Sequence, residues 1–394
     1  MKILSVVGAR PNFMKVAPFI QAIVDHNKRI TDNLQLITHL LVHTGQHYDD
    51  RMSKTFFEEL GIPKANINLG IGSGSHAEQV GQTMMAFEKV LEAEKPDWVV
   101  VVGDVNATLA CSVTAKKMHI KVCHIEAGLR SGDERMPEEI NRLVTDRLSD
   151  LLLTPDTLSS ENLVKEGVSD EKIKFVGNIM IDTLESNRNK AQKLIITKII
   201  ESNLVKGQNI EIKSLIVRDF ETKQGSFALL TVHRPSNVDQ KDILEPIIRF
   251  LLDEVSIDMP IIWPIHPRTQ NQLQIFGLWN EVMANNKLIL LHPLGYHEML
   301  KLNMVAQIML TDSGGLQEEC TVLGTPCLTL RWNTERPITL RKNGGASVLV
   351  GNNIIRIREA YKNTLKRNRI PDRPELWDGK TAKRVLEAIL KATD

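Results

Sequence analysis

Short runs of apolar and β-branched residues alternate with helical patterns along most of the chain. Strands are predicted at residues 3–7, 36–43, 98–102, 121–124, 227–232, 260–264, 287–291, 306–310 and 327–330. Helical stretches lie between these runs, for instance at 107–118. Strands that alternate with helices are typical of βαβ units and a parallel sheet. The pattern therefore predicts an α/β fold with two Rossmann-like, doubly wound domains facing a cleft.

The same pattern indicates where the domains begin and end. We expect one domain at residues 1–185 and a second at 226–372. Residues 186–225 are rich in Lys and Asn and lack sustained strand character, so we expect a long, partly helical connection there. Residues 373–394 carry apolar side chains at helical spacing and are predicted to form an amphipathic helix.

Composition narrows the class of protein. The 394 residues are 42% apolar and 25% charged, which is usual for a globular protein of roughly two domains. A formal charge of +1 with dispersed Lys and Arg gives no reason to expect nucleic acid or an anionic membrane as a partner. The sequence has no signal-peptide or membrane-span pattern, and its four cysteines form no CxxC or zinc-type pattern. We therefore expect a cytoplasmic protein with reduced, mostly buried thiols.

Polar or charged side chains directly follow six of the predicted strands. They are Arg10 and Lys15, Asp104, Glu126, His233 and Arg234, His266 and Arg268, and Asp312 and Ser313. Open α/β sheets bind ligands outside the carboxyl ends of their strands. Six such strand ends in one chain therefore indicate a single large polar cleft, which would be the active site.

Several of these strand-end residues also have a structural interpretation. Asp104 could cap the following helix, and Glu126 could make a structural hydrogen bond. His124, on a predicted strand, is more often a satisfied core histidine than a catalyst. His266 could brace its proline turn, and Lys15 could be solvated. Their joint placement, rather than any single residue, favours a functional site.

The sharpest local signal is the segment TDSGGLQEE at residues 311–319. A strand leads into a turn at Gly314 and Gly315, and a helix follows. Free N–H groups and the helix dipole at such a turn favour a diphosphate, with Ser313 as N-cap or additional donor. Glu319, further into the helix, could accept both hydroxyls of a ribose. The segment predicts a site for a nucleotide-diphosphate sugar, although a plain Ser-capped helix has the same pattern.

Two further cations follow the next predicted strand. Arg331 and Arg336 suit a phosphate or the hydroxyls of a sugar. The alternative is a surface ion pair with Glu335.

Longer motifs occur in order along the chain. They are GARP (8–11), TGQH (44–47), GD (103–104), HIEAGLR (124–130), PEEINR (137–142), HR (233–234), HPR (266–268), DSGGLQEE (312–319) and TERP (334–337). The series closely resembles the non-hydrolysing UDP-N-acetylglucosamine 2-epimerases, over most of the chain. The resemblance implies a glycosyltransferase-B-like fold with a C-terminal helix that crosses back to the first domain. It also implies a homodimer, with neither a metal nor a bound nicotinamide cofactor.

The resemblance implies roles for individual residues as well. Around the diphosphate it places Arg10, His233, Ser313, Gly314 and Gly315. At the ribose it places Glu319, and at the uracil the backbone of Leu294 and Met299. Around the sugar it places Lys15, Asp104, Glu126, Glu138 and Arg336.

The reaction that the resemblance implies is an elimination followed by re-addition. A base removes the proton on C2 while UDP leaves C1, which gives a bound 2-acetamidoglucal, and UDP re-adds after C2 is protonated on its other face. This chemistry needs cations on the leaving diphosphate and at least two acid/base groups near the ring. Asp104, Glu126 and Glu138 are the candidates, and His233 completes the expected catalytic set. Asp104 and Glu126 come first because they end two consecutive strands that we expect to be neighbours.

Three segments depart from the family pattern. Residues 233–237 read HRPSN where HRREN is common, and residues 339–345 replace a Glu-x-Gly-Thr segment. Residues 46–49 read QHYD in place of a Gln-His-Arg segment, which argues against activation by a second substrate molecule.

The expected product is UDP-N-acetylmannosamine for surface polysaccharide. One alternative is a hydrolysing enzyme that releases N-acetylmannosamine, and another is a 2-epimerase of a 2,3-diacetamido uronic acid UDP-sugar. A retaining glycosyltransferase and a catalytically silent nucleotide-sugar sensor are the remaining alternatives.

Overall fold

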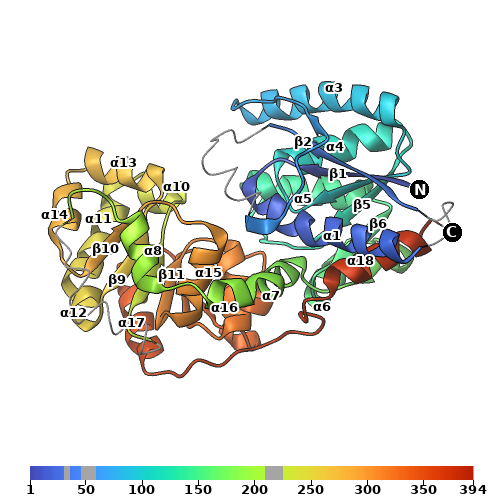
Figure 1. The fold of residues 1–394 in the computed structure, drawn as a ribbon. Helices are drawn as coiled ribbons and strands as arrows, with labels where there is room; N and C mark the ends of the chain where they lie inside the picture. Colours follow the sequence, from blue (N-terminus) through green and yellow to red (C-terminus); the bar gives the residue numbers. More distant parts are fainter. Residues whose placement is uncertain (31–35, 46–58, 209–224, 394) are drawn as a thin grey trace. The chain divides into compact units, whose positions relative to one another are not determined.

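The computed structural model describes residues 1–30, 36–45, 59–208 and 225–393. The chain divides into two compact units (Figure 1). The first consists of Met1–Ser186 together with Pro374–Asp394, and the second of Asn187–Arg373. Each unit has its own parallel sheet and its own apolar cores.

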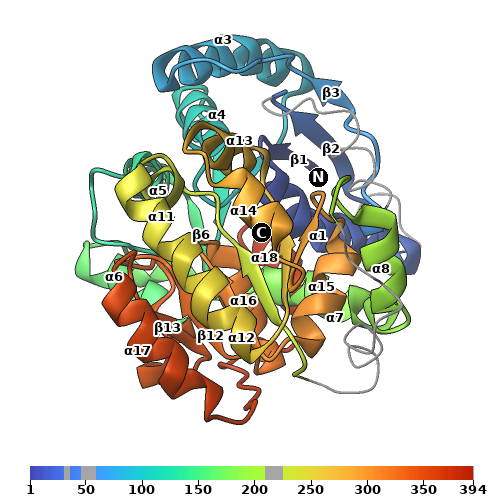
Figure 2. The same cartoon turned by 90° about the vertical axis from the view of Figure 1, so that its left-hand side faces the viewer.

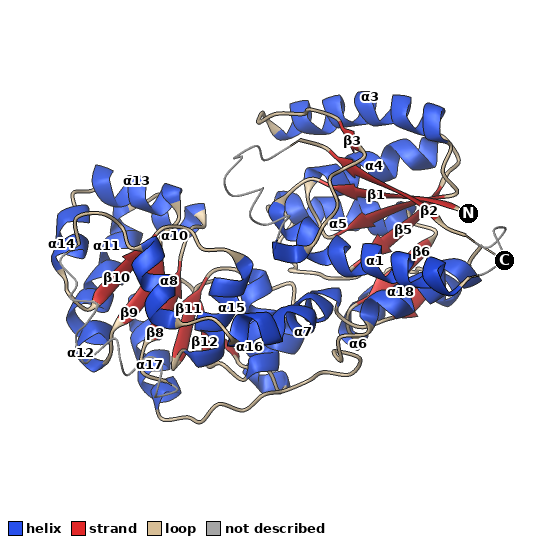
Figure 3. Ribbon diagram, in the orientation of Figure 1, coloured by secondary structure: helices blue, strands red, loops and turns tan. Residues whose placement is uncertain are grey.

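Among the described residues of the first unit, seven strands form one parallel sheet (Figure 3). They are β1 (Lys2–Val7), β2 (Thr38–His43), β3 (Ile67–Asn68), β4 (Trp98–Val102), β5 (Lys121–Ile125), β6 (Leu151–Thr154) and β7 (Ile173–Phe175). They lie in the order β3-β2-β1-β4-β5-β6-β7, so the direction of strand addition reverses between β1 and β4. Such a reversal is the switch point outside which doubly wound sheets bind ligands.

Helices cover both faces of this first sheet. They are α1 (Arg10–Arg29), α3 (His76–Glu94), α4 (Asn106–Lys117), α5 (Pro137–Leu148), α6 (Thr157–Lys165), α7 (Ile179–Gln192) and α18 (Thr381–Lys391), with a 3-10 helix at Asp170–Lys172. On one face α1 and α18 pack over Ile3 and Trp98, and on the other α3 and α4 pack over Leu4 and Val99. Successive strand residues alternate between the faces, so both faces of these apolar strands are buried.

The amphipathic helix expected in residues 373–394 is α18. It buries Val385, Leu386 and Ile389 in the core that contains Ile3. The C-terminal helix thus covers a face of the sheet to which the first residues of the chain contribute β1.

The second unit repeats the plan with six strands among its described residues. They are β8 (Ala228–Thr231), β9 (Ile261–Pro264), β10 (Leu288–Leu291), β11 (Ile308–Thr311), β12 (Cys327–Thr329) and β13 (Ser347–Leu349). Their order is β10-β9-β8-β11-β12-β13, and all are parallel. The switch point of this sheet therefore lies between β8 and β11.

Helices cover both faces of the second sheet as well. They are α8 (Ile196–Asn203), α10 (Pro235–Val238), α11 (Lys241–Phe250), α12 (Ser256–Asp258), α13 (Pro267–Ile275), α14 (Trp279–Ala284), α15 (Tyr296–Val305), α16 (Gly314–Leu323) and α17 (Ile354–Leu365). A π-helical turn at Leu251–Val255 joins α11 to α12, and 3-10 helices lie at Pro337–Thr339 and Arg341–Asn343. Cys320 of α16 packs with Cys327, whereas Ile357 of α17 packs with Leu328, so these helices cover opposite faces of β12 (Figure 2).

The predicted α/β fold with two Rossmann-like sheets is confirmed. All nine predicted strands are present, with ends shifted by at most two residues. Strands β3, β6, β7 and β13 were not predicted. Residues 187–208, which we expected in a connection, belong to the second unit, and α8 buries Ile199 and Ile200 in its core.

Two expectations from composition can also be compared with the structure. All four cysteines are buried and unpaired, as expected of core thiols. Among the described residues, no helix is both long enough and apolar enough to cross a membrane.

Candidate active site

Two of the predicted carboxylates follow neighbouring strands at the first switch point. In the sheet β4 pairs with β5, and Val102 lies opposite Ile125, so the expectation that these strands are neighbours is confirmed. Asp104 and Glu126 therefore leave the same edge of the sheet. Glu126 has a left-handed backbone (φ 70°), which is uncommon for a residue with a side chain and often marks a functional turn.

Glu126 forms a buried ion pair with Lys15 of α1. The Lys15 ammonium contacts Oε2, and both side chains are almost fully buried. Gly103 (φ 69°) leaves room for this pair, since a Cβ there would lie 3.2 Å from Lys15 Nζ. Among the described residues, Oε1 of Glu126 has no hydrogen-bond partner. The interpretation of Lys15 as a solvated side chain is therefore wrong.

Asp104 is held by a chain of charges that ends on backbone N–H groups. Its carboxylate pairs with Arg142 of α5, and Arg142 also pairs with Glu139. Glu139 accepts hydrogen bonds from the N–H groups of Ser131 (3.0 Å) and Gly132 (2.9 Å). Burial alone would raise the pKa of Glu139, but these N–H groups and Arg142 hold that pKa below its usual value. Glu139 thus stays ionised and orients Arg142, which orients Asp104.

Two further expectations concern Asp104 and Glu138 in the first unit. Asp104 does not cap the next helix, because the cap position of α4 is Val105 and the Asp104 carboxylate turns to Arg142. Glu138 lies in the first turn of α5 with an exposed side chain and no ion-pair partner among the described residues. Its neighbour Glu139 is the buried carboxylate. A role for Glu138 beside the sugar stays a prediction.

His124 is a core histidine, as its structural interpretation expected. Its ring is fully buried, with Nδ1 2.6 Å from Asp146 Oδ1 and Nε2 2.9 Å from the carbonyl oxygen of Gly103. Burial alone would raise the pKa of Asp146, but the charges and hydrogen bonds of His124 and Arg130 hold it below its usual value. The histidine therefore joins a charged network behind the Gly103 turn.

In the second unit Asp312 organises the switch point between β8 and β11. Its Oδ2 accepts hydrogen bonds from the backbone N–H groups of His233 (2.9 Å) and Arg234 (2.8 Å), and from Asn237 Nδ2 (3.1 Å). Its Oδ1 lies 2.9 Å from His233 Nδ1. Burial would raise the pKa of Asp312, but the contacts with His233 and Arg234 lower it. The His233 side chain, 41% exposed, is thus oriented by a buried carboxylate.

The predicted phosphate seat is the start of α16. Ser313 occupies the N-cap position, but its side chain makes no capping hydrogen bond, so the interpretation as a plain Ser-capped helix is wrong. Its own N–H bonds to Thr311 Oγ1 at 3.0 Å. Gly314 and Gly315 open the helix. A Cβ on Gly314 would lie 2.9 Å from Arg336 Nη1, so this glycine allows the arginine to approach the helix start.

Arg336 belongs to a buried network of two cations and two carboxylates. Its Nε lies 2.7 Å from Glu318 Oε1, and its Nη1 contacts Glu335. Arg331 Nη2 lies 2.6 Å from the other oxygen of Glu335. The expected pair of Arg331 with Glu335 is therefore present, but it is buried and not at the surface. Opposite charges in equal number make burial of the whole group tolerable.

Glu319, predicted to hold the ribose, is buried below the helix start. Burial raises its pKa to about 7, against hydrogen bonds from Tyr296 and Asn303 that lower it. Leu294 and Met299, predicted beside the uracil, both pack in the adjoining core, with Leu294 buried and Met299 partly buried. These three residues share one side of the second sheet.

Two expected features cannot be placed. Arg10 is the first residue of α1, but its side chain lies outside the described part of the chain. Residues 46–49, the departure linked to a second substrate molecule, also lie outside the described residues.

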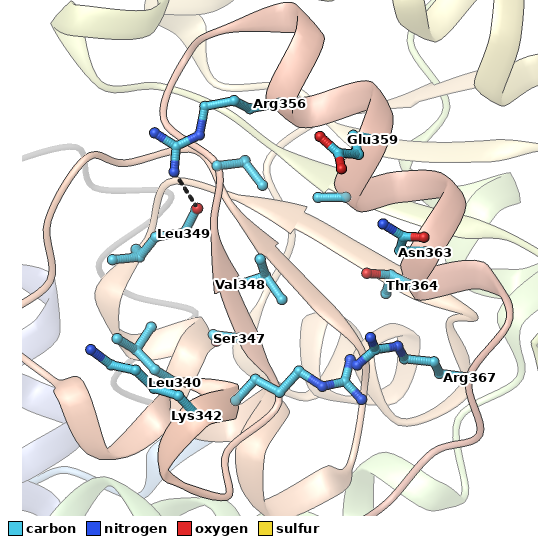
Figure 4. Close-up of a pocket in the computed structure, with 13 residues that line it drawn as sticks. Leu340, Lys342, Ser347, Val348, Leu349, Arg356, Glu359, Asn363, Thr364 and Arg367 are labelled. Atoms are coloured by element: carbon cyan, nitrogen blue, oxygen red, sulfur yellow. Dashed lines mark hydrogen bonds between the residues drawn. The ribbon is translucent and has the colours of Figure 1, made fainter.

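A separate cavity of about 540 Å³ lies in the second unit between β13 and α17 (Figure 4). Arg341, Lys342, Arg356 and Arg367 reach its rim with Glu359, over apolar β13 side chains. None of the predicted site residues lines it. The arginine Arg356 turns to the carbonyl oxygen of Leu349 at 3.4 Å.

Sequence reasoning missed the residues that hold the candidates in place. The side-chain oxygen of Asn12 accepts hydrogen bonds from the N–H groups of Gly8 and Ala9. Its side-chain nitrogen donates to the carbonyl oxygen of Val102 at 2.8 Å, which ties β1 to β4 at the switch point. Arg142, which orients Asp104, is the other such residue. Asn12 and Arg142 lie within the GARPN and PEEINR segments, but nothing in either segment shows which residue each side chain contacts.

Each unit has the plan of a nucleotide-binding α/β protein, with its polar groups at a switch point. A family model described as UDP-N-acetylglucosamine 2-epimerase matches residues 29–390. The chain is 40% identical over 392 residues to the UDP-N-acetylglucosamine 2-epimerase of Methanocaldococcus jannaschii, covering 99% of each. It is 37% identical to the UDP-2,3-diacetamido-2,3-dideoxy-D-glucuronate 2-epimerase of Pseudomonas aeruginosa, covering 99% of this chain and 100% of that relative.

A crystal structure of the Methanocaldococcus jannaschii UDP-GlcNAc 2-epimerase, in complex with UDP-GlcNAc and UDP, matches with a TM-score of 0.84 at 39% identity. The match covers 99% of this chain and 100% of that one. The protein is therefore an isomerase of the nucleotide-sugar class. More specifically, it belongs to the UDP-N-acetylglucosamine 2-epimerase family. The resemblance drawn from the motifs is confirmed.

Proposed function

We propose that this chain interconverts UDP-N-acetylglucosamine and UDP-N-acetylmannosamine by elimination and re-addition of UDP. Family membership and the names of the relatives support the substrate. The observation that carries the reaction type is the pair of carboxylates on adjacent strand ends, Asp104 and Glu126, each with its own buried cation.

In the proposed first step a carboxylate takes the proton from C2 of the sugar. The electron pair of that C–H bond forms the C1=C2 double bond, and the C1–O bond to UDP breaks. A second carboxyl group, which carries a proton at this stage, then delivers that proton to C2 on the opposite face, and the UDP oxygen re-forms its bond to C1. Two acid/base groups are required because the proton leaves and returns on different faces. Asp104 and Glu126 are our candidates for this pair, and Glu138 is the third.

The two carboxylates lie in different environments. Glu126 is buried and pairs with Lys15, whereas the Asp104 side chain is 26% exposed and pairs with Arg142. Each carboxylate thus has its own cation, so either one could accept the C2 proton in one direction of the reaction while the other delivers a proton to the opposite face.

The leaving diphosphate would lie at the switch point of the second unit. There His233, the start of α16 and Arg336 offer hydrogen-bond donors and positive charge. Such groups stabilise charge that develops on the leaving oxygen. Glu319 would accept the ribose hydroxyls, and Arg10 would add a cation. A UDP site of this kind would account for the close approach of the buried Arg336 to the turn at Gly314.

The name of the relative from Pseudomonas aeruginosa supports one alternative substrate. Its name gives a 2,3-diacetamido uronate, and the identity of 37% is close to the 40% of the N-acetylglucosamine relative. Such a sugar carries a carboxylate at C6 and needs a cation there. A hydrolysing enzyme, which would release free N-acetylmannosamine, is the other alternative.

The test is incubation of the purified enzyme with UDP-N-acetylglucosamine in deuterium oxide. We expect deuterium at C2 of both UDP-N-acetylhexosamines and no free sugar, measured by NMR and mass spectrometry. Free N-acetylmannosamine would support the hydrolysing alternative. No change in this substrate, with turnover of the diacetamido uronate, would overturn the substrate assignment.

A further inference from the structure

His124 connects the two strand ends that carry the candidate acid/base carboxylates. It lies on β5 two residues before Glu126, and its Nε2 is 2.9 Å from the carbonyl oxygen of Gly103, the residue before Asp104. Gly103 also donates its N–H to the carbonyl of Ile125 at 3.1 Å. The peptide groups on both sides of Gly103 are therefore held by β5.

Both ring nitrogens of His124 face hydrogen-bond acceptors. The carbonyl of Gly103 can only accept, and Asp146 Oδ1 lies 2.6 Å from Nδ1. Asp146 Oδ2 already accepts from the N–H of Gly128 (3.0 Å) and from Arg130 (2.7 Å), as an ionised carboxylate does. A neutral imidazole has a single N–H, so one of its nitrogens would turn a lone pair toward an oxygen. A ring with two N–H groups satisfies both contacts.

The charges around His124 balance only when the ring is an imidazolium. Arg130 makes two hydrogen bonds of 2.7 Å to Glu166 and one to Asp146. Along the series Glu166, Arg130, Asp146 and His124 the signs then alternate and sum to zero. A neutral His124 would leave the fully buried Asp146 in a group with a net negative charge, which is costly away from water.

We propose that His124 is a positioning residue that carries a proton on both ring nitrogens and directs Asp104 through the carbonyl of Gly103. This proposal rests on the proposed function of Asp104. The Asp104 carbonyl is fixed from the other side by Asn141 Nδ2 at 2.8 Å. Because the peptide groups before and after Asp104 are both held by hydrogen bonds, the direction of its Cα–Cβ bond is fixed.

Two substitutions at His124 separate its two hydrogen bonds. In His124→Asn the amide nitrogen replaces Nδ1 and keeps the donor to Asp146, but the donor to Gly103 is lost. In His124→Gln the amide nitrogen can reach the position of Nε2 and keeps the donor to Gly103. Asp170→Asn is the control, since it alters an exposed carboxylate of the same unit that lies outside this network.

We expect His124→Asn to lower kcat for UDP-N-acetylglucosamine roughly 100-fold with KM nearly unchanged, because a misplaced acid/base group slows chemistry without weakening binding. His124→Gln should recover at least about tenfold of that loss, and Asp170→Asn should keep the wild-type kcat. UDP affinity and thermal unfolding, measured in parallel, identify a variant that fails to fold. Equal losses in the two His124 variants, or a change confined to KM, would overturn the positioning role.

The protonation state is tested on the wild-type protein without substrate. In a sample with ¹⁵N-labelled histidine at neutral pH, the two ring nitrogens of His124 should both show an attached proton. The His124→Gln spectrum assigns the signals by their loss. A nitrogen without a proton would refute the imidazolium even if both variants are inactive. A wild-type enzyme that leaves UDP-N-acetylglucosamine unchanged would instead refute the proposed function and leave this result standing.

Discussion

Several charged side chains at the candidate site of the first unit are buried as ion pairs. Lys15 with Glu126, and Arg142 with Glu139, are almost fully enclosed. Removing one partner of a buried pair leaves an uncompensated charge and costs roughly 3–5 kcal/mol. Variants at these positions therefore confound catalysis with folding, so Asp104, which is partly exposed, is the better probe.

For Asp104→Asn we expect deuterium exchange at C2 to fall by roughly 10²–10⁴-fold, the usual contribution of an acid/base group. UDP affinity should stay within the wild-type range, because the proposed UDP seat lies in the other unit. Exchange is measured by NMR and affinity by calorimetry. Asp170→Asn, an exposed carboxylate of the same unit, is the control. Wild-type exchange in Asp104→Asn would remove this residue from the mechanism.

The raised pKa of Glu319 makes the stability of the UDP-free protein depend on pH. Its pKa is about 7 in the fold and 4.5 without the fold's influence, so between these values the folded state binds more protons than the unfolded one. Stability should therefore fall as pH rises from about 4.5 to about 7, by roughly 3 kcal/mol. In Glu319→Gln that fall should shrink by this amount in urea unfolding at several pH values. Identical pH profiles for wild type and variant would contradict it.

Glu319→Ala should weaken UDP binding if the carboxylate accepts the ribose hydroxyls. Loss of hydrogen bonds to a charged acceptor costs roughly 1.5–3 kcal/mol, or about 10- to 150-fold in affinity. Calorimetry with UDP measures this directly. UDP that lacks the 2′-hydroxyl should bind the variant and the wild type more equally, and unchanged UDP affinity would remove the ribose role.

At the scale of elements, the apolar pattern found most strands that are buried on both faces, but it missed the buried strand β6 and the short edge strands β3, β7 and β13. The run WVVVV of β4 can only be an interior strand. By contrast β3 has two residues and β7 and β13 have three, too few for a periodicity to show. Their strand state depends on the neighbour they pair with, which the sequence does not reveal.

The candidate site was likewise predicted only in part from the sequence. Residues at strand ends, such as Asp104 and Glu126, were found because strand order puts them at one sheet edge. Their partners were missed because the pairing is tertiary: Arg142 reaches Asp104 from a helix 38 positions later in the chain. Nor does any local pattern distinguish Glu138 from Glu139, of which only the second is buried.

Helix α18 is the element whose packing is easiest to test. Ile389 is fully buried in the core that contains Phe19 and Trp98. Ile389→Ala should lower the free energy of unfolding by roughly 2–5 kcal/mol, the cost of a lost side chain and its cavity. Urea unfolding measures it, with the exposed Lys383→Ala as control. A change below about 0.5 kcal/mol would mean that α18 does not stabilise the sheet.

At the scale of the whole molecule, the proposed binding and catalytic groups belong to different units. Residues 187–373 contain His233, the α16 start and Arg336, whereas the carboxylates Asp104 and Glu126 lie outside that segment. Binding of UDP and chemistry at C2 are therefore separable in principle. The continuous second unit has its own sheet and core, which is what a fragment needs to fold.

We expect a fragment of residues 187–373 to fold and bind UDP without catalysing exchange at C2. Circular dichroism shows folding, and UDP should raise the unfolding midpoint, because binding at 100 times Kd adds about 2.7 kcal/mol. A folded fragment that does not bind UDP would show that first-unit groups such as Arg10 are required for the seat.

The first unit is discontinuous, and this has a consequence during protein synthesis. Residues 187–373 leave the ribosome before 374–394, so the second unit can fold while the first still lacks α18. Until that helix emerges, the apolar faces of Ile3 and Phe19 have no cover from it. A chaperone that binds exposed apolar surface would therefore bind the N-terminal residues of the nascent chain. It would be displaced when the C-terminal residues emerge and α18 covers that surface.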